Sequence, residues 1–152
     1  MANEAVVGTI MTRRVASVAM DESLRRVREL FNSVGFHHLV VVEGGRVVGV
    51  ISDRDLLRHL SPFVDRVNER AQDAATLTKR AHQVMSRPVV TCEESTPIGE
   101  AGRRMLDRRV TCLPVVDARG GCVGVVTMRD ILAWSLVACA GQETSCPLPK
   151  AA

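Results

Sequence analysis

The sequence predicts a mixed α/β (α+β) fold in which two tandem β-α-β-β-α repeats pack with pseudo-two-fold symmetry. Three observations lead to this class. Three stretches of the first half return in the same order in the second half, which indicates an internal duplication. Runs of β-branched residues in each copy have the length and composition of buried strands, and apolar residues between these runs recur at helical spacing.

The duplication is visible in the matching stretches themselves. Residues 10–13 (IMTR) return as 84–87 (VMSR), residues 39–43 (LVVVE) as 113–117 (LPVVD), and residues 49–57 (GVISDRDLL) as 124–132 (GVVTMRDIL). One additional residue in the second copy falls within 118–121, where a turn between strands tolerates a change of length. We therefore expect one repeat at 8–60 and the other at 84–138.

The elements of the two copies follow one order. In the second copy Thr96 can cap the first helix and Pro97 suits its first turn. A strand, a helix, two hairpin strands and a second helix are expected at 15–18, 24–34, 39–43, 46–51 and 53–60, and again at 89–92, 98–106, 113–117, 122–126 and 128–139.

Two segments lie outside the repeats. Residues 61–83 connect the copies, and both a solvated linker and a packed helical connector are compatible with their composition, in which Pro62 ends the preceding helix. Residues 139–152, with Pro147 and Pro149, are expected to form a disordered tail.

Composition excludes several classes of protein. Aromatic residues make up 3% of the chain and the net charge is +3, so binding of nucleic acid by base stacking is not expected. No stretch of eighteen apolar residues exists, and residues 1–5 do not resemble a signal peptide, so no membrane span is expected. The five cysteines contain no C-x-x-C pair, which argues against a zinc site or disulfide framework and favours a cytoplasmic protein.

The pattern that carries chemistry is Ser52-x-x-Asp55, which returns as Thr127-x-x-Asp130. Each copy follows a strand and opens an apolar helix, so one interpretation is a capping box that only stabilises the helix. The same geometry can also hold a nucleotide. A helix N-terminus attracts phosphate, the neighbouring Arg54 or Arg129 can bind phosphate oxygens, and a carboxylate can accept both hydroxyls of a ribose. The second occurrence favours nucleotide binding.

With this motif in place, the β-α-β-β-α repeat resembles the cystathionine β-synthase (CBS) domain, and the tandem pair resembles a Bateman module. The resemblance covers residues 8–138 apart from the connector. It implies a regulatory module, not an enzyme, that binds adenosine-containing ligands between the repeats. The implied candidates are AMP, ADP, ATP, NAD or S-adenosylmethionine, with no cofactor required. It also implies a homodimer and a protein effector of unknown identity. The first repeat departs from the family pattern at Val40, where proline is common.

The resemblance also implies the residues of two sites, by register with the γ subunit of AMP-activated protein kinase. We name each site after its aspartate. The Asp130 site would contain Thr127, Arg129, Asp130, Val125, Thr111 and Cys112, with Met11, Ala16, Phe36 and His37 from the first repeat. The Asp55 site would contain Ser52, Arg54, Asp55, Val50, His37 and His38, with Met85, Val90, Val110 and Thr111 from the second.

Three of these residues, and the motif itself, are compatible with a second role. His37 and His38 could bind a metal, but adjacent residues at the start of a strand point to opposite faces, so lining of a pocket or core is favoured and no metal is expected. Cys112 could sense oxidants, although the role of a small core residue is favoured. A structural interaction protein with empty clefts, in which both aspartates only cap helices, is the alternative function.

Overall fold

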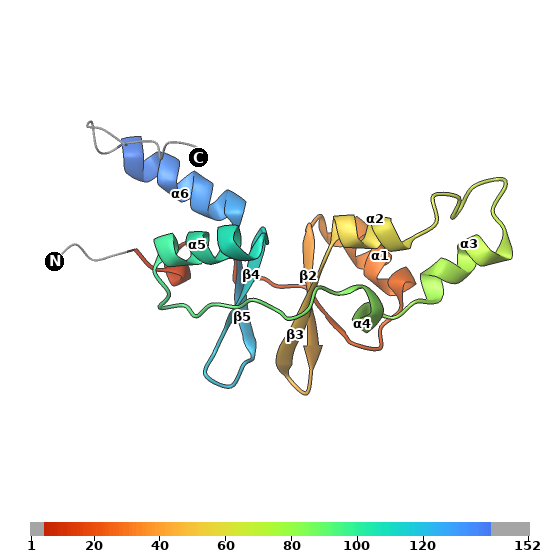
Figure 1. Ribbon diagram of the computed structural model, residues 1–152, viewed down its shortest axis with the longest axis horizontal. Coiled ribbons are helices and arrows are strands. Elements are labelled where there is room, and N and C mark those ends of the chain that lie inside the picture. Colours follow the sequence, from red (N-terminus) through yellow and green to blue (C-terminus); the bar gives the residue numbers. More distant parts are fainter. Residues whose placement is uncertain (1–4, 141–152) are drawn as a thin grey trace.

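The computed structural model describes residues 5–140 and shows the expected mixed α/β (α+β) architecture in two halves (Figure 1). The first repeat contains β1 (Ser17–Ala19), α1 (Leu24–Val34), β2 (His38–Glu43), β3 (Arg46–Ser52) and α2 (Asp53–His59). The second contains α5 (Ile98–Arg108), β4 (Cys112–Val116), β5 (Cys122–Thr127) and α6 (Met128–Ala140). The sheets have the orders β1-β2-β3 and β4-β5, with antiparallel hairpins.

The segment that begins each repeat packs on the other half of the molecule. After the short 3-10 helix η1 (Val7–Thr9), Thr12 exchanges two backbone hydrogen bonds of 2.9 Å with Val125 in β5. Ser86, at the start of the second repeat, donates its N–H to the carbonyl of Val50 in β3 at 2.9 Å. Each sheet therefore gains an edge contact from the copy to which it does not belong.

This exchange divides the core into two clusters, each completed by a foreign segment. The first surrounds β2 and β3 and includes Val84 and Met85 from the start of the second repeat. The second surrounds β4 and β5 and includes Val7 and Met11 from the N-terminal segment. Since all four side chains are at most 9% exposed, they are core residues of the half that receives them.

The strand expected at 89–92 does not form, and this prediction was wrong. In the first repeat, the Val40 N–H donates to the carbonyl of Ala16 at 3.1 Å and holds β1 parallel to β2. Pro114 stands at the corresponding position of β4 and has no N–H to donate. Only Cys92 pairs there, through a single parallel bridge to Val115. The second sheet consequently has two strands, where the first has three.

Two expectations about element ends also need correction. Thr96 does not cap α5, because its Oγ1 accepts the N–H of Glu93 at 3.0 Å and Pro97 occupies the N-cap position. Cys139 and Ala140 belong to α6 rather than to a tail. The remainder of the predicted tail, 141–152, lies outside the described residues.

The connector is a packed helical segment rather than a solvated linker. It contains α3 (Ala71–Ala75), the 3-10 helix η2 (Thr76–Thr78) and α4 (Ala81–Val84). Leu77 and Ala81 are buried, and Asp73 accepts hydrogen bonds from Ser61 Oγ at 2.6 Å and from the Arg70 N–H at 2.9 Å. Backbone hydrogen bonds anchor the connector on the first half, because Leu24 donates its N–H to the Lys79 carbonyl at 2.8 Å and Ala81 donates its N–H to the Glu22 carbonyl at 2.8 Å. Figure 1 shows α3 and α4 beside α1 and α2.

Candidate functional site

Both predicted capping boxes are formed, and they have the same geometry. The backbone N–H and the hydroxyl of Ser52 donate to Asp55 Oδ2 at 2.9 and 2.7 Å, and the Asp55 N–H donates to Ser52 Oγ at 3.1 Å. For Thr127 and Asp130 the three corresponding distances are 2.8, 2.7 and 3.3 Å. Within residues 5–140, the second carboxylate oxygen of each aspartate accepts no hydrogen bond from the protein. Capping therefore occupies one oxygen of each carboxylate and leaves the other available.

The two capping boxes open onto one continuous cleft between the repeats, with a volume of about 820 Å³. Both aspartates and both hydroxyl residues line it. A smaller space of about 110 Å³, which we call the side recess, adjoins the cleft next to Thr127. The side recess is lined by Thr12, Arg14, Val15, Ala16, Phe36, His37, His38, Val125 and Thr127.

Most residues predicted for the two sites line these spaces together. The cleft receives Phe36, His37, His38, Val50, Ser52, Arg54, Asp55, Val90, Val110, Thr111, Cys112, Thr127, Arg129 and Asp130, and the side recess adds Ala16 and Val125. Met11 and Met85 line neither space. They pack beneath the strands instead, where Met11 contacts Gly124 and Met85 contacts Gly49. The binding role of each lining residue stays a prediction.

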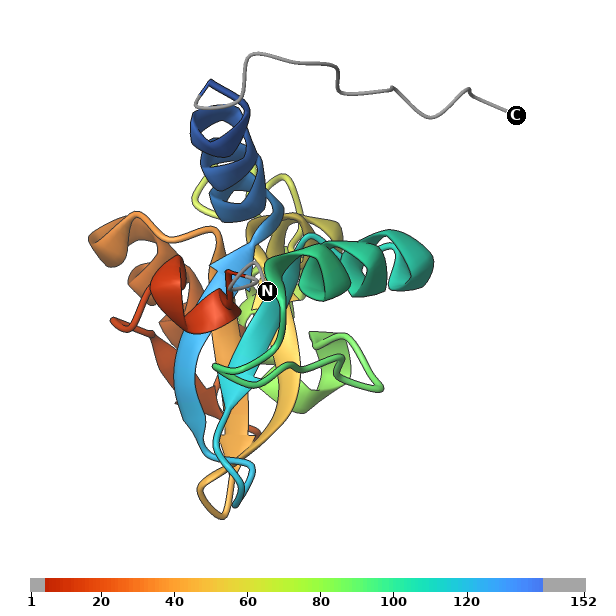
Figure 2. The same ribbon diagram turned by 90° about the vertical axis from the view of Figure 1, so that its left-hand side faces the viewer.

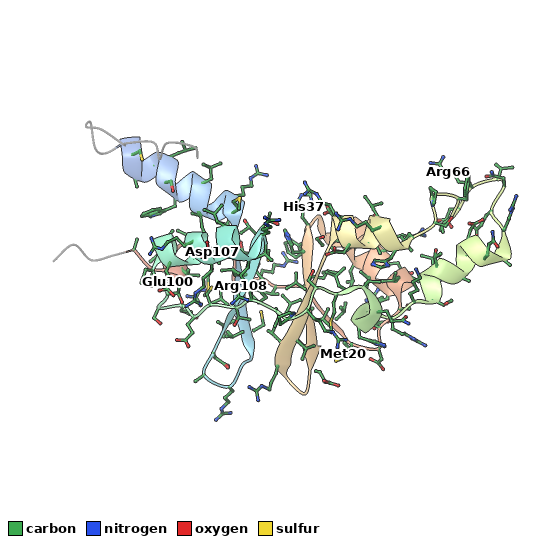
Figure 3. The ribbon with its side chains drawn as sticks, viewed as in Figure 1. Met20, His37, Arg66, Glu100, Asp107 and Arg108 are labelled. Atoms are coloured by element: carbon green, nitrogen blue, oxygen red, sulfur yellow. The ribbon has the colours of Figure 1, made fainter. Side chains whose placement is uncertain are left out.

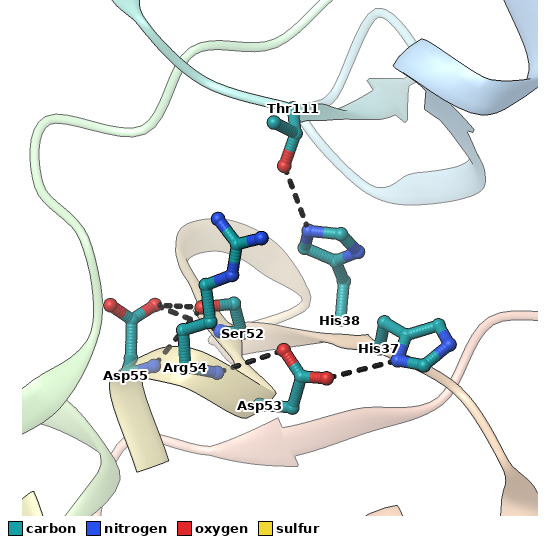
Figure 4. A network of polar contacts seen from close by, with 7 residues as sticks. All are labelled: His37, His38, Ser52, Asp53, Arg54, Asp55 and Thr111. Carbon is teal, nitrogen blue, oxygen red and sulfur yellow. Dashed lines mark hydrogen bonds and ion pairs between the residues drawn. The ribbon is translucent and has the colours of Figure 1, made fainter. Parts of the chain in front are cut away.

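Polar contacts connect the two repeats across the cleft (Figure 4). His38 Nε2 lies 3.3 Å from Thr111 Oγ1, which joins β2 to the segment that leads into β4. His37 Nδ1 lies 2.9 Å from Asp53 Oδ2, and Asp53 Oδ1 also accepts the Arg54 N–H at 2.8 Å. Figure 3 shows His37 at the end of β2, between the two halves. The adjacent histidines thus make separate contacts and do not converge.

Burial and hydrogen bonding shift the pKa values of several side chains around the cleft. Burial lowers the pKa of His38 below its usual value, which favours the neutral imidazole. The hydrogen bond from His37 lowers the pKa of Asp53, so this carboxylate is charged. Burial raises the pKa of the Cys112 thiol to about 12. Because the thiolate is the reactive form, this value argues against Cys112 as an oxidant sensor.

Unpaired arginines give the cleft a cationic rim. Arg54, Arg58, Arg109 and Arg129 line the cleft and Arg14 lines the side recess. None of their guanidinium groups forms an ion pair or hydrogen bond within the described part of the chain. Free guanidinium groups are suited to phosphate or carboxylate oxygens.

The predicted sites omitted several lining residues. They are Thr12, Arg14, Val15, Gly35, Asp53, Arg58, Ser86, Pro88, Val89, Arg109 and Met128. A signal was present for Thr12 and Ser86, because both lie in the duplicated stretches 10–13 and 84–87. The chain crossing that brings these stretches to the opposite repeat explains their place in the cleft.

Two further properties of residues 5–140 concern the requirements of a membrane span and of a metal site. None of their helices combines the length and apolar character needed to cross a bilayer. No group of three or more His, Cys, Asp or Glu side chains among them is arranged to hold a metal ion.

The exchanged segments, the hairpins and the paired Ser/Thr-x-x-Asp helices define a tandem pair of related domains. The family model of the CBS domain matches residues 7–62 and 81–137, and the chain belongs to this family. A CBS domain-containing protein of Dictyostelium discoideum is 33% identical over 129 residues, which are 84% of this chain and 88% of that protein.

Solved structures agree with the family assignment. CBSX2 in complex with AMP superposes with a TM-score of 0.70 and 28% identity, covering 88% of this chain and 97% of that one. The cytosolic domain of the Mg²⁺ channel MgtE in complex with ATP gives a TM-score of 0.68 and 28% identity, covering 87% and 49%. Several other curated relatives are longer proteins. The chain spans 60% of an uncharacterized protein of Methanopyrus kandleri and 22% of the inosine-5'-monophosphate dehydrogenase of Thermoplasma acidophilum.

Proposed function

We propose that this protein is a regulatory module that binds adenosine-containing ligands in the cleft between its two CBS domains. Ligand binding would shift the packing of the halves, and an effector protein would respond to that shift. Such signalling requires that the ligand bind the two arrangements unequally. We place the module in the cytoplasm, in accord with its free cysteines, and assign it no catalytic role, since its resemblance is to regulatory domains.

One observation carries the proposal. Asp55 and Asp130 each present an unoccupied carboxylate oxygen to the same cleft while the other oxygen fixes the side chain at a helix start. A carboxylate held in this way is ready to accept ribose hydroxyls, and the adjacent Arg54 and Arg129 can bind phosphate. Related structures that contain AMP or ATP support this class of ligand.

The proposal is tested by Asp55→Asn and Asp130→Asn. Each change removes the charge while keeping the size and one acceptor oxygen. We expect a loss of about 1.5–3 kcal/mol in binding at the altered site, or roughly ten- to a hundredfold in affinity. Calorimetric titration with AMP, ATP and S-adenosylmethionine measures this loss, and 2′-deoxyribose analogues should bind the unmutated protein less well for the same reason.

Melting curves of the same variants separate binding from capping. The capping box is formed in either case, so each variant should also lose about 0.5–2 kcal/mol of stability. If aspartate served the helix alone, the variants would melt earlier yet bind as the parent does. That result would contradict the ribose role of the altered aspartate. The alternative function, an interaction protein whose cleft stays empty, would instead be supported if none of these ligands bound the unmutated protein.

We also propose that the module forms a two-fold homodimer through α2 and α6. Leu57 on α2 and Leu132, Leu136 and Val137 on α6 are 59–75% exposed. Leu56 on α2 is buried in the first core, and Ile131 on α6 packs against the second, so neither belongs to this exposed face. Figure 2 shows α6 standing out from the rest of the protein, and an apolar helix in that position is normally covered by another surface.

The dimer is tested by light scattering at high micromolar concentration. The unmutated protein should have twice the mass of one chain, because two-fold closure covers both copies of the exposed face. Leu132→Lys combined with Leu136→Lys should give a folded monomer. Val67→Lys, at an exposed position of the connector, should leave the dimer intact. A monomeric unmutated protein would contradict the proposal.

A further inference from the structure

We propose that the side recess receives the adenine of a ligand at the Asp130 site, and that this site fills first because Phe36 and Arg14 border the recess. This inference rests on the proposed function, that the cleft binds adenosine-containing ligands. It goes further by ranking the sites and by naming the residues that set the rank.

The duplication allows the two sites to be compared position by position. His38 pairs with Ser52 in the first sheet, and Cys112 pairs with Thr127 in the second, so these residues are equivalent. Two residues before His38 and Cys112 stand Phe36 and Val110, which are therefore equivalent as well.

The exchanged segments give a second pair of equivalent positions. Thr12 pairs with Val125 in β5 and Ser86 pairs with Val50 in β3. Two residues beyond these bridges stand Arg14 on one side and Pro88 on the other. Two residues further, Ala16 lines the side recess and Val90 lines the cleft.

These differences all favour adenine at the Asp130 site. Phe36 is the only Phe, Tyr or Trp among the described residues that line the cleft or the side recess, and its ring is partly exposed. An aromatic ring or an arginine plane gives a base a stacking surface, which valine and proline do not provide to the same degree. Ala16 also occupies less of the space available to a base than Val90 does.

A ranked pair of sites would widen the concentration range of the sensor. At low ligand concentration only the Asp130 site would be occupied, and the Asp55 site would respond at higher concentration. The effector could then distinguish an empty, a half-loaded and a fully loaded module.

The experiment is a calorimetric titration of AMP into the unmutated protein, Phe36→Val and Val110→Phe. We expect two binding steps in the unmutated protein. Phe36→Val, which installs the residue of the weaker site, should weaken the first step about tenfold or more. Val110→Phe should strengthen the second step. Phe63→Val makes the same chemical change on the connector, away from the cleft, and should leave both steps unchanged.

The aspartate variants assign the steps to sites. Asp130→Asn should weaken the tighter step roughly ten- to a hundredfold, and Asp55→Asn should weaken the other step by a similar factor. Loss of the tighter step in Asp55→Asn, two equal steps in the unmutated protein, or an unchanged first step in Phe36→Val would each overturn the ranking while leaving the proposed function intact. If AMP, ATP and S-adenosylmethionine all fail to bind the unmutated protein, the proposed function fails and the ranking fails with it.

Discussion

At the scale of single residues, His38 makes the stability of the protein depend on pH. Burial lowers its pKa in the folded state below the ordinary value of 6.5. The unfolded chain therefore takes up a proton at a higher pH than the folded one, and the contribution of His38 to stability is complete above pH 6.5. That contribution is lost as the pH falls from 6.5 through the lower folded pKa.

We expect the free energy of unfolding to decrease between about pH 7 and pH 5, and the decrease to be smaller in His38→Gln. Chemical denaturation at several pH values measures the free energy of unfolding of both proteins. Thr111→Val is the control, since it removes the hydrogen bond but leaves His38 buried, and should keep the pH dependence. Asp53, whose pKa is lowered, contributes stability that is lost only below its ordinary value of 3.8. An identical pH dependence in His38→Gln and the parent would contradict the assignment.

At the scale of elements, close contact between β5 and the exchanged N-terminal segment depends on Gly124. A Cβ at this position would lie 2.7 Å from Met11 Sδ and 3.1 Å from the Thr12 carbonyl oxygen. The second of these atoms belongs to the backbone bridge, so it cannot move without loss of pairing.

Gly124→Ala should therefore destabilise the protein by about 1–3 kcal/mol, which urea denaturation would show. Gly99→Ala in α5 is the matched control. A Cβ at position 99 would lie 3.7 Å from Arg103 Nη1, which is an ordinary van der Waals contact. Alanine also favours a helix more than glycine does. If Gly124→Ala were as stable as the parent or more stable, the contact between β5 and the N-terminal segment would not require glycine at this position.

At the scale of the whole molecule, the exchange of segments makes the two halves interdependent. A fragment of residues 1–70 lacks Ala81, Val84 and Met85, which complete the first core. The loss of several buried side chains from a unit of this size exceeds what a marginal domain tolerates.

We expect this fragment to be unfolded or aggregated by itself, with little dispersion in its NMR spectrum. Addition of the complementary fragment, residues 71–152, should restore a dispersed spectrum because it supplies the missing core residues. A dispersed spectrum of a stable monomer from residues 1–70 alone would contradict the interdependence.

The sequence by itself determined the features that depend on local patterns. The helical spacing of apolar residues, the β-branched hairpins and the Ser/Thr-x-x-Asp starts of α2 and α6 each involve residues a few positions apart. Their duplication was enough to predict the fold class, and the family resemblance that it carries implied most of the residues that line the cleft.

Only the tertiary structure decided features that depend on contacts between distant segments. The strand at 89–92 was lost because its partner position holds Pro114, whose missing N–H matters only once the two segments are side by side. Met11 and Met85 became core residues, while Thr12 and Arg14 reached the side recess, because the chain crosses between halves. The same carboxylates also cap their helices and face the cleft, a combination that a local motif cannot reveal because the opposite wall is formed by the other repeat.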